Sequence, residues 1–301
     1  DSSPGAISLP APSRAGNLST MGTTLPPGTR MGSVELAAAD FAGMRGFYEN
    51  VIGLEVVDTS DDGVSLGTGG SGLVRLLDRA GAPRKPYGTT GLFHLALLVP
   101  DRPALAQAVR RVVDNGWRFT GASDHLVSEA LYLDDPEGNG IEIYRDRPRE
   151  EWSRRAGEIE MATLPLDLDA VMEELPKREV PARIAAGTTM GHVHLQVADL
   201  AETEAFYVDG LGFEVTVRGY PGALFVSAGG YHHHLGLNTW AGEGAPPPPP
   251  GYTGLRRYEV VVPSSDVFEE VKVRLDGSAA ELTDEGLVAT DPSGNEVLLR
   301  A

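Results

Sequence analysis

The chain has no cysteine among its 301 residues, which excludes disulfide bonds, thiolate-bound zinc and a cysteine nucleophile. Basic residues are few, since 25 Lys and Arg stand against 43 Asp and Glu, for a formal net charge of −18. This balance argues against a nucleic-acid partner, which needs clustered positive charge for the phosphate backbone. No run approaches the roughly 20 apolar residues of a membrane-spanning helix, so we expect no membrane association. The lack of cysteine fits a reducing compartment, and we predict a cytoplasmic location.

Residues 1–30 have neither the basic start nor the apolar run of a secretory signal. They are rich in Pro, Gly, Ser and Thr, and we expect them to form a mobile N-terminal tail. The composition as a whole, with 41% hydrophobic and 23% charged residues, is that of an ordinary globular protein long enough for two domains.

After the tail, one unit recurs four times. Residues 32–57 and 191–216 show it most clearly: a strand, an Asp, an amphipathic helix that contains Phe-Tyr, a turn with Gly, and another strand. The second and fourth units begin at residues 91 and 254 and end with Asp-Pro turns before a last strand. This pattern predicts an α+β fold of four βαβββ repeats, in which Asp40 and Asp199 cap the helices that follow them.

The repeats divide the chain into two modules. We expect an N-terminal module over 31–147 with repeats one and two, and a C-terminal module over 188–301 with repeats three and four. A bridging segment over 148–187 joins them and should contain a short helix near 168–175. A proline-rich linker over 242–252 connects repeats three and four as an extended spacer.

All seven histidines lie between His94 and His234, which indicates one metal site. His94 and His192 stand at matched positions, each seven residues before the Asp that caps the next helix, and Glu142 lies in the last strand of repeat two. A single histidine in an apolar strand is more often a core residue than a ligand, but three acceptors at matched positions favour a metal. Two imidazoles and one carboxylate are the facial ligand set of non-haem Fe(II), and Mn(II) shares it.

The same positions in repeats one and four lack ligands. Ser33 stands where repeats two and three have histidine, and repeat four has Arg257 and Leu298 in place of the histidine and the glutamate. Serine is a poor ligand and arginine cannot bind a metal ion. We therefore predict that repeats two and three build one metal-binding cup across the two halves, while repeats one and four pair as a scaffold.

The other histidines are assigned by position in their strands. Alternation along a strand puts His194 on the same face as His192, so we expect it in the substrate pocket. We place His233 at the position in repeat three that Glu142 holds in repeat two, so it should point toward the metal.

The sequence around these residues completes the predicted pocket. For His232 and His234 an outward or interface position is the simpler interpretation. Asn238 and Trp240 could shape the pocket wall, together with Tyr132 and a movable proline-rich linker.

Four segments, GLFHLALLVPDR, SDHLVSEALYLDDPEGNGIEIYRDRPREEW, MGHVHLQVADL and SAGGYHHHLGLNTW, resemble the vicinal oxygen chelate superfamily, which contains glyoxalases, bleomycin resistance proteins and extradiol dioxygenases. Within it the chain is similar to the two-module catechol 2,3-dioxygenase type, over residues 31–301. The resemblance implies paired repeats that form cup-shaped mixed sheets around one metal. It also implies an Fe(II)-dependent extradiol dioxygenase, which cleaves a catechol with O2 to a muconic semialdehyde.

The resemblance also implies roles for single residues and partners. His233 would stabilise superoxide and act as acid or base, and His125 would hydrogen-bond the substrate oxygen. Tyr132 is a further candidate donor, although its register differs from that of the family by two residues. The partners would be a small aromatic diol and O2, in a monomer or homodimer.

Two other functions stay open at this point. A glyoxalase-type isomerase or a thiol transferase is another metal enzyme of the superfamily, but glyoxalase-type sites use a second carboxylate where this chain has His233. A metal-free binding or resistance protein is the more distant alternative, and such proteins usually lose the ligands that this chain keeps.

Overall fold

The computed structural model describes residues 24–155, 157–177 and 180–301. Most of the predicted tail, residues 1–23, therefore lies outside the described residues. Leu25 is already buried, and its N–H donates to the carbonyl of Gly212. Leu25, which we expected to lie in the mobile tail, therefore belongs to the folded core.

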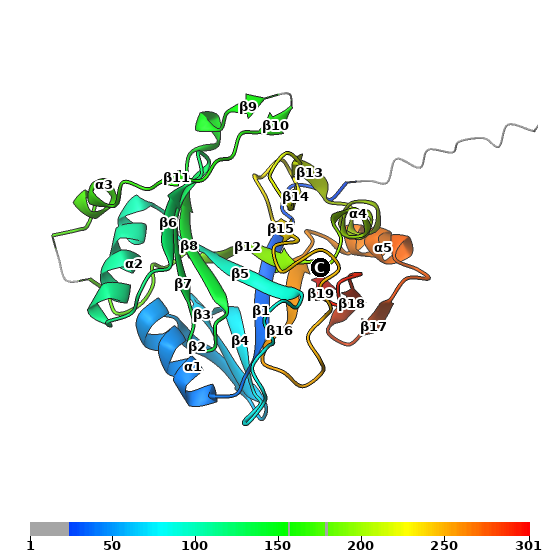
Figure 1. The fold of residues 1–301 in the computed structure, drawn as a ribbon, viewed down its shortest axis with the longest axis horizontal. Coiled ribbons are helices and arrows are strands. Elements are labelled where there is room, and N and C mark those ends of the chain that lie inside the picture. Colours follow the sequence, from blue (N-terminus) through cyan, green and yellow to red (C-terminus); the bar gives the residue numbers. More distant parts are fainter. Residues whose placement is uncertain (1–23, 156, 178–179) are drawn as a thin grey trace, which may run out of the picture.

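The described residues form two large mixed sheets, and each sheet takes strands from both halves of the chain (Figure 1). The eight-stranded sheet consists, in order, of β17 (Ala280–Thr283), β18 (Gly286–Thr290), β19 (Glu296–Arg300), β16 (Gly254–Val261), β1 (Arg30–Ala38), β4 (Ser71–Asp78), β3 (Gly63–Thr68) and β2 (Glu55–Ser60). The nine-stranded sheet consists of β11 (Leu164–Pro165), β6 (Gly121–Asp124), β7 (Ser128–Asp134), β8 (Gly140–Asp146), β5 (Gly91–Leu98), β12 (Thr189–Gln196), β15 (Leu235–Asn238), β14 (Ala223–Ser227) and β13 (Glu214–Val217).

The pairing of the repeats is the one that the ligand positions predicted. In the nine-stranded sheet, β5 of repeat two pairs antiparallel with β12 of repeat three. In the eight-stranded sheet, β1 of repeat one pairs antiparallel with β16 of repeat four. The first and last strands of a repeat run parallel, as in β5 with β8 and β12 with β15. The α+β class and the βαβββ order of the repeats are thereby confirmed.

Each repeat places a helix after its first strand, and each helix begins at a capping side chain. The helices are α1 (Phe41–Phe47), α2 (Arg102–Asp114), α4 (Leu200–Glu204) and α5 (Ser265–Arg274). Asp40 and Asp199 accept backbone N–H groups of the first turns of α1 and α4, as predicted, and Asp101 and Ser264 do the same for α2 and α5. Figure 1 shows α1 and α2 beside one another on one side of the molecule and α4 and α5 on the other.

Helices α1 and α4 continue into π-helical turns, η1 (Tyr48–Ile52) and η3 (Ala205–Leu211). Both turns end at a glycine with positive φ, 87° at Gly53 and 95° at Gly212, a conformation that other residues rarely adopt. Tyr48 and Tyr207 lie in these turns and are fully buried.

The bridge between the modules contains four short elements besides β11: η2 (Arg149–Glu151), β9 (Arg154–Arg155), β10 (Glu158–Ile159) and α3 (Leu168–Glu173). Helix α3 confirms the short helix that we predicted in this segment. Strand β11 pairs with β6 and so extends the nine-stranded sheet, which the sequence did not indicate.

A hydrogen-bonded Tyr–Asp–Asn group fastens the two repeats of the N-terminal module together. The Tyr48 hydroxyl donates to Asp135 Oδ2 at 3.2 Å, and Asn139 Nδ2 donates to the same oxygen at 2.8 Å. Tyr207, Asp291 and Asn295 repeat this arrangement in the C-terminal module. In both modules the turn before a last strand is thus bound to the helical segment of the preceding repeat.

The Asp135 group makes stability depend on pH. Burial raises the pKa of Asp135 from 3.8 to about 6, although Asn139 and Tyr48 donate hydrogen bonds to it. A raised carboxyl pKa means that the folded chain binds the proton more tightly than the unfolded chain. The stabilisation is therefore complete below the unfolded pKa and is lost as pH rises through the folded one. Relative to Asp135→Asn, we expect the free energy of unfolding to fall by about 2 kcal/mol between about pH 4.5 and pH 7. Urea titrations measure this difference, and a difference that stays constant with pH would contradict the prediction.

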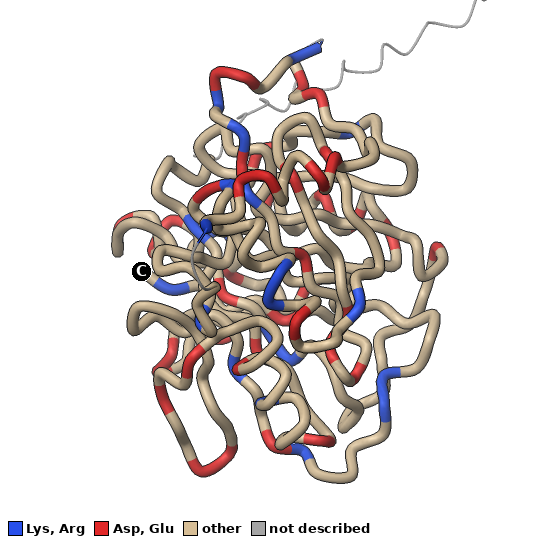
Figure 2. Tube along the Cα trace, turned by 90° about the vertical axis from the view of Figure 1, so that its left-hand side faces the viewer, with Lys and Arg blue, Asp and Glu red and all other residues tan. Residues whose placement is uncertain are grey.

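Charge is distributed widely over the fold. Figure 2 shows acidic segments from the top to the bottom of the view, with basic segments between them. In the described ranges, no helix is both long and apolar enough to cross a membrane.

Candidate metal centre

Three adjacent strands of the nine-stranded sheet bring His94, Glu142 and His192 together. Glu142 Oε2 lies 3.0 Å from His94 Nε2 and 3.1 Å from His192 Nε2, and the two nitrogens are 3.3 Å apart. None of the three residues is more than 6% exposed. In the part of the chain that the structure describes, this is the group of His, Asp and Glu side chains found able to surround a metal ion. The structure thus brings His94 and Glu142 of the N-terminal module next to His192 of the C-terminal module, as the sequence predicted.

The electrostatics of the cluster suit a cation. Burial by itself would raise the pKa of Glu142, but the hydrogen bonds and charges of His192 and His94 outweigh it and hold that pKa well below its usual range. Burial lowers the pKa of His192 to about 4. At neutral pH Glu142 is thus a carboxylate and His192 a neutral imidazole, the protonation states in which both residues bind metals.

The donor set also fits a metal in its geometry. Two Nε2 atoms and Glu142 Oε2 face one another at 3.0, 3.1 and 3.3 Å inside a buried site. A divalent cation between them would replace this crowding with three bonds. Two imidazole nitrogens and one carboxylate oxygen are borderline-to-hard ligands that suit Fe(II) or Mn(II).

The cluster opens into a cavity of about 480 Å³. All but one of the residues predicted for the catalytic group and the pocket line it: His125, Tyr132, His194, His233 and Trp240. Further lining comes from the aromatic residues Phe93, Tyr220 and Phe225 and from the bridge residues Met161, Ala162 and Thr163. A cavity of this size with flat apolar walls and a few convergent polar groups is typical of a small-molecule site.

His125 and Tyr132 share a short hydrogen bond whose direction follows from a third group. His125 Nδ1 lies 2.7 Å from the Ala162 carbonyl, which only accepts, so this nitrogen carries the proton. His125 Nε2 then accepts from the Tyr132 hydroxyl at 2.6 Å. Burial and the nearby charge of Glu142 raise the pKa of Tyr132 well above its usual value, so the phenol keeps its proton.

His233 reaches the cavity by a route that differs from our prediction. Glu142 is paired with Ala96 in the sheet, and the equivalent pair in repeat three joins His194 and Gly236. Gly236 therefore holds the position of Glu142, and its Cβ, if present, would lie 2.8 Å from the ring of His194. The prediction that His233 holds the position of Glu142 was wrong, because His233 lies in the irregular segment between a turn and β15, where counting along a strand does not apply.

The prediction for His232 and His234 was also wrong, since both are buried, with 0% and 8% exposure. His232 Nε2 lies 2.9 Å from Asp146 Oδ1. His234 Nδ1 accepts the Ala228 N–H at 3.2 Å, and burial lowers the pKa of His234 to about 4. The three successive histidines follow a turn, so alternation does not send the neighbours of His233 to the surface.

Two further expectations about the pocket wall need correction. Asn238 is fully buried at the end of β15, outside the lining of the cavity, and its Oδ1 accepts the Trp240 N–H at 3.0 Å. It thus holds the residue that does line the cavity. Pro247 and the prolines that follow it border a separate cavity over the eight-stranded sheet, so the proline-rich linker is not a wall of this site.

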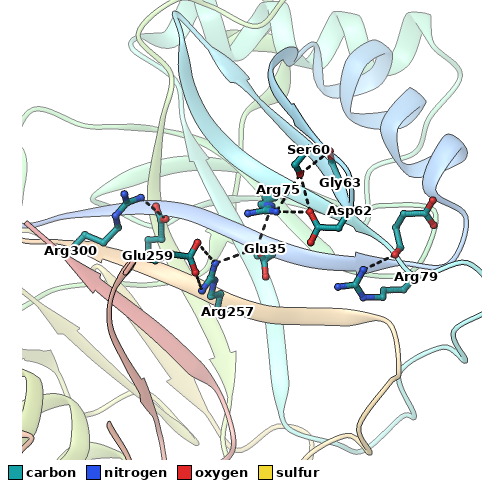
Figure 3. Close-up of polar contacts among 11 residues, drawn as sticks. Glu35, Ser60, Asp62, Gly63, Arg75, Arg79, Arg257, Glu259 and Arg300 are labelled. Carbon is teal, nitrogen blue, oxygen red and sulfur yellow. Dashed lines mark hydrogen bonds and ion pairs between the residues drawn. The ribbon is translucent and has the colours of Figure 1, made fainter. Parts of the chain in front are cut away.

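In the eight-stranded sheet, ion pairs lie at the place where the nine-stranded sheet has its His–Glu–His group (Figure 3). Arg257 pairs with Glu285 at 2.7 Å, and Glu35 lies 3.7 Å from Arg257 and 3.5 Å from Arg75. The backbone N–H of Ser33 donates to Glu259 Oε2 at 2.9 Å. Among the described residues, the group found able to surround a metal ion lies in the nine-stranded sheet.

Comparisons with known proteins agree with this architecture. The sequence model of the glyoxalase/bleomycin resistance protein/dioxygenase superfamily matches residues 30–143 and 189–299. Catechol-2,3-dioxygenase of Bacillus subtilis (strain 168) is 41% identical over 277 residues, which are 90% of this chain and 96% of that protein.

Solved structures share the fold at low sequence identity. A putative dioxygenase from Bacillus subtilis subsp. subtilis str. 168 has a TM-score of 0.60 and 15% identity, over 92% of this chain and 86% of the other. Glyoxalase I from Zea mays has a TM-score of 0.55 and 16% identity, over 90% and 92%.

The fold and the site together define a class of protein: α+β proteins built from paired βαβββ repeats, with a buried His–Glu–His group that could hold a metal ion. The chain belongs to the glyoxalase/bleomycin resistance protein/dioxygenase superfamily, as the sequence resemblance implied.

Proposed function

We propose that this chain is an extradiol dioxygenase, which uses Fe(II) to insert O2 into a catechol-type ring and releases a muconic semialdehyde. The observation that carries the proposal is the His94–Glu142–His192 cluster at a cavity of about 480 Å³, in a chain 41% identical to a catechol-2,3-dioxygenase. His94, Glu142 and His192 would hold the metal. When bound, the metal would supply a common centre at which the diol passes electrons to O2.

His233 is the group best placed to move a proton at the diol. Its ring centroid lies 4.1 Å from that of His192, so it stands directly beside the cluster. Burial, reinforced by the neighbouring imidazoles, lowers the pKa of His233, which leaves the ring neutral and able to accept a proton from a catechol hydroxyl. The same ring can return that proton later in the reaction.

His125 and Tyr132 would bind a substrate oxygen from the other wall of the cavity. Tyr132 lies opposite Glu142 in the β7–β8 pair, so its hydroxyl is close to the cluster. In this structure the Tyr132 hydroxyl donates its proton to His125, and it could donate instead to a substrate oxygen that enters between Tyr132 and His125. The pair thus supplies a hydrogen bond without adding a charge.

The aromatic wall suits a flat ring. Phe93, His194 and Trp240 pack edge to face or tilted, with centroids 5.2–5.3 Å apart, and leave apolar surface toward the cavity. Aromatic pairs favour these geometries, and a catechol ring would extend the same packing.

The test is oxygen consumption after anaerobic loading with Fe(II), with a panel of catechols and detection of the yellow ring-opened product. We expect uptake that His192→Ala abolishes and Ser33→Ala, at the equivalent position of the eight-stranded sheet, leaves unchanged. A chain that binds one metal but consumes no oxygen with any diol would contradict the proposal, and isomerisation of a methylglyoxal–glutathione adduct would then be assayed. A chain that binds no metal would point to a binding protein.

Replacement of His233 tests its proposed role. We expect His233→Gln to lower kcat by about 100-fold, because a glutamine cannot accept the catechol proton. Metal content should stay at the wild-type level, since His233 is outside the ligand set. Steady-state kinetics with metal analysis measure both, and an unchanged kcat would remove His233 from the mechanism.

A further inference from the structure

We propose that His232 and Asp146 are positioning residues for His233: they fix its ring with the proton on Nδ1 and leave Nε2 as the lone-pair nitrogen for the cavity. The importance of this state rests on the proposed function, because a proton acceptor is needed beside the diol. The contacts that impose it are independent of that function.

The direction of each hydrogen bond follows from the chemistry of its acceptor. His232 Nε2 lies 2.9 Å from Asp146 Oδ1, and a carboxylate only accepts, so this nitrogen carries a proton. We take His232 as the neutral imidazole, which has one N–H and so has a lone pair on Nδ1. That nitrogen lies 2.8 Å from His233 Nδ1, which must then be the donor. The remaining nitrogen of His233, Nε2, carries the lone pair, and His233 lines the cavity.

The surroundings of His232 hold this arrangement in place. The His232 ring is completely buried, and Tyr231 and Trp152 pack on it with centroids at 4.1 and 5.3 Å. The Tyr231 hydroxyl donates to the same Asp146 oxygen at 3.2 Å, so Asp146 has two donors. A buried ring between aromatic neighbours cannot rotate freely.

The consequence concerns which edge of His233 can act as a base. With the proton on Nε2, the cavity edge would be a donor and could not take a catechol proton. A carboxylate that sets the state of a histidine through its other nitrogen is a known way to prepare a base. Here one more imidazole stands between the carboxylate and the base.

The measurement is ¹⁵N NMR of the full chain with ¹⁵N-labelled histidine near pH 7, with Zn(II) as a diamagnetic ion. The His233 signals are assigned by their loss in His233→Gln. In the wild type we expect Nδ1 of His233 to show the shift of a protonated nitrogen and Nε2 that of a bare one.

Two variants test the cause. Asp146→Asn can donate to His232 Nε2 and so moves the His232 proton to Nδ1, which should reverse the His233 pattern. His232→Phe removes the acceptor while it keeps a buried ring, and it should also shift the His233 proton toward Nε2. Tyr231→Phe is the matched control, because it removes the other donor to Asp146 and should leave the pattern unchanged.

The outcomes separate this inference from the proposed function. A wild-type His233 protonated on Nε2, or a pattern that both variants leave unchanged, would overturn it. If the NMR pattern is as expected but no catechol is turned over, the proposed function fails and the positioning stands. If turnover is found, Asp146→Asn should lower kcat by about 100-fold while KM and metal content stay unchanged.

Discussion

Glu142→Gln should remove metal binding and turnover together. Glutamine keeps the size of the side chain and loses the negative charge, while two imidazoles within 3.1 Å stay in place. Because even outer partners of metal ligands contribute about 10- to 100-fold to affinity, loss of the anionic ligand should lower affinity by more than about 100-fold. Metal analysis after dialysis and oxygen uptake with a catechol measure the two effects.

The matched control for this variant is Glu35→Gln. Glu35 is a partly buried carboxylate of the eight-stranded sheet, held by arginines instead of histidines, and burial raises its pKa. This control should keep full metal content. A Glu142→Gln chain that retains one metal per molecule would show that the carboxylate is not a ligand.

Gly191→Ala should destabilise the fold by more than about 3 kcal/mol, because the core cannot accept one extra methyl group there. A Cβ at residue 191 would lie 1.8 Å from the Tyr144 hydroxyl oxygen. Tyr144 is fully buried, its hydroxyl lies 2.7 Å from that of Tyr231, and its ring packs 4.9 Å from that of His192. The tyrosine cannot move without disturbing both the core and a proposed ligand.

Chemical denaturation measures this effect, and Gly46→Ala is its control. Gly46 lies in α1, where a Cβ would meet one side-chain atom at 3.9 Å, so alanine should stabilise the helix by about 0.5–1 kcal/mol. Equal stability of wild type and Gly191→Ala would mean that Tyr144 has room to shift.

The features that follow from strand periodicity and repeat counting were predictable from the sequence. The capping Asp of repeats one to three fixed the count that matched His94 with His192 and found Ser33 without ligand ability. In repeat four, the proline that follows the first strand served the same purpose and located Arg257. Because each repeat has the same strand order, the ligand count alone decided which repeats pair. The sheets then confirmed that pairing.

The features that depend on turns and on tertiary contacts were not predictable in this way. His232 and His234 are buried by a turn whose course no periodicity describes. Ala162 reaches the site because the bridge folds back along β6 through a strand of only two residues, too short to leave a pattern. Phe93 was missed because it directly precedes His94, and strict alternation would place it on the opposite face from His94. An irregularity in the β5–β12 register near these residues disturbs that alternation.

Because each sheet takes strands from both halves, one sheet can have metal-ligating residues while the equivalent positions of the other sheet lack them. Two identical half-length chains that paired as these modules do would necessarily form two equal cups, and any substitution would appear in both. In a single chain the two cups are encoded separately. Ser33, Arg257 and Leu298 could therefore replace ligands in one sheet while His94, Glu142 and His192 stayed in the other. Within a single chain, the eight-stranded sheet can thus hold ion pairs at the place where the nine-stranded sheet holds its His and Glu acceptors.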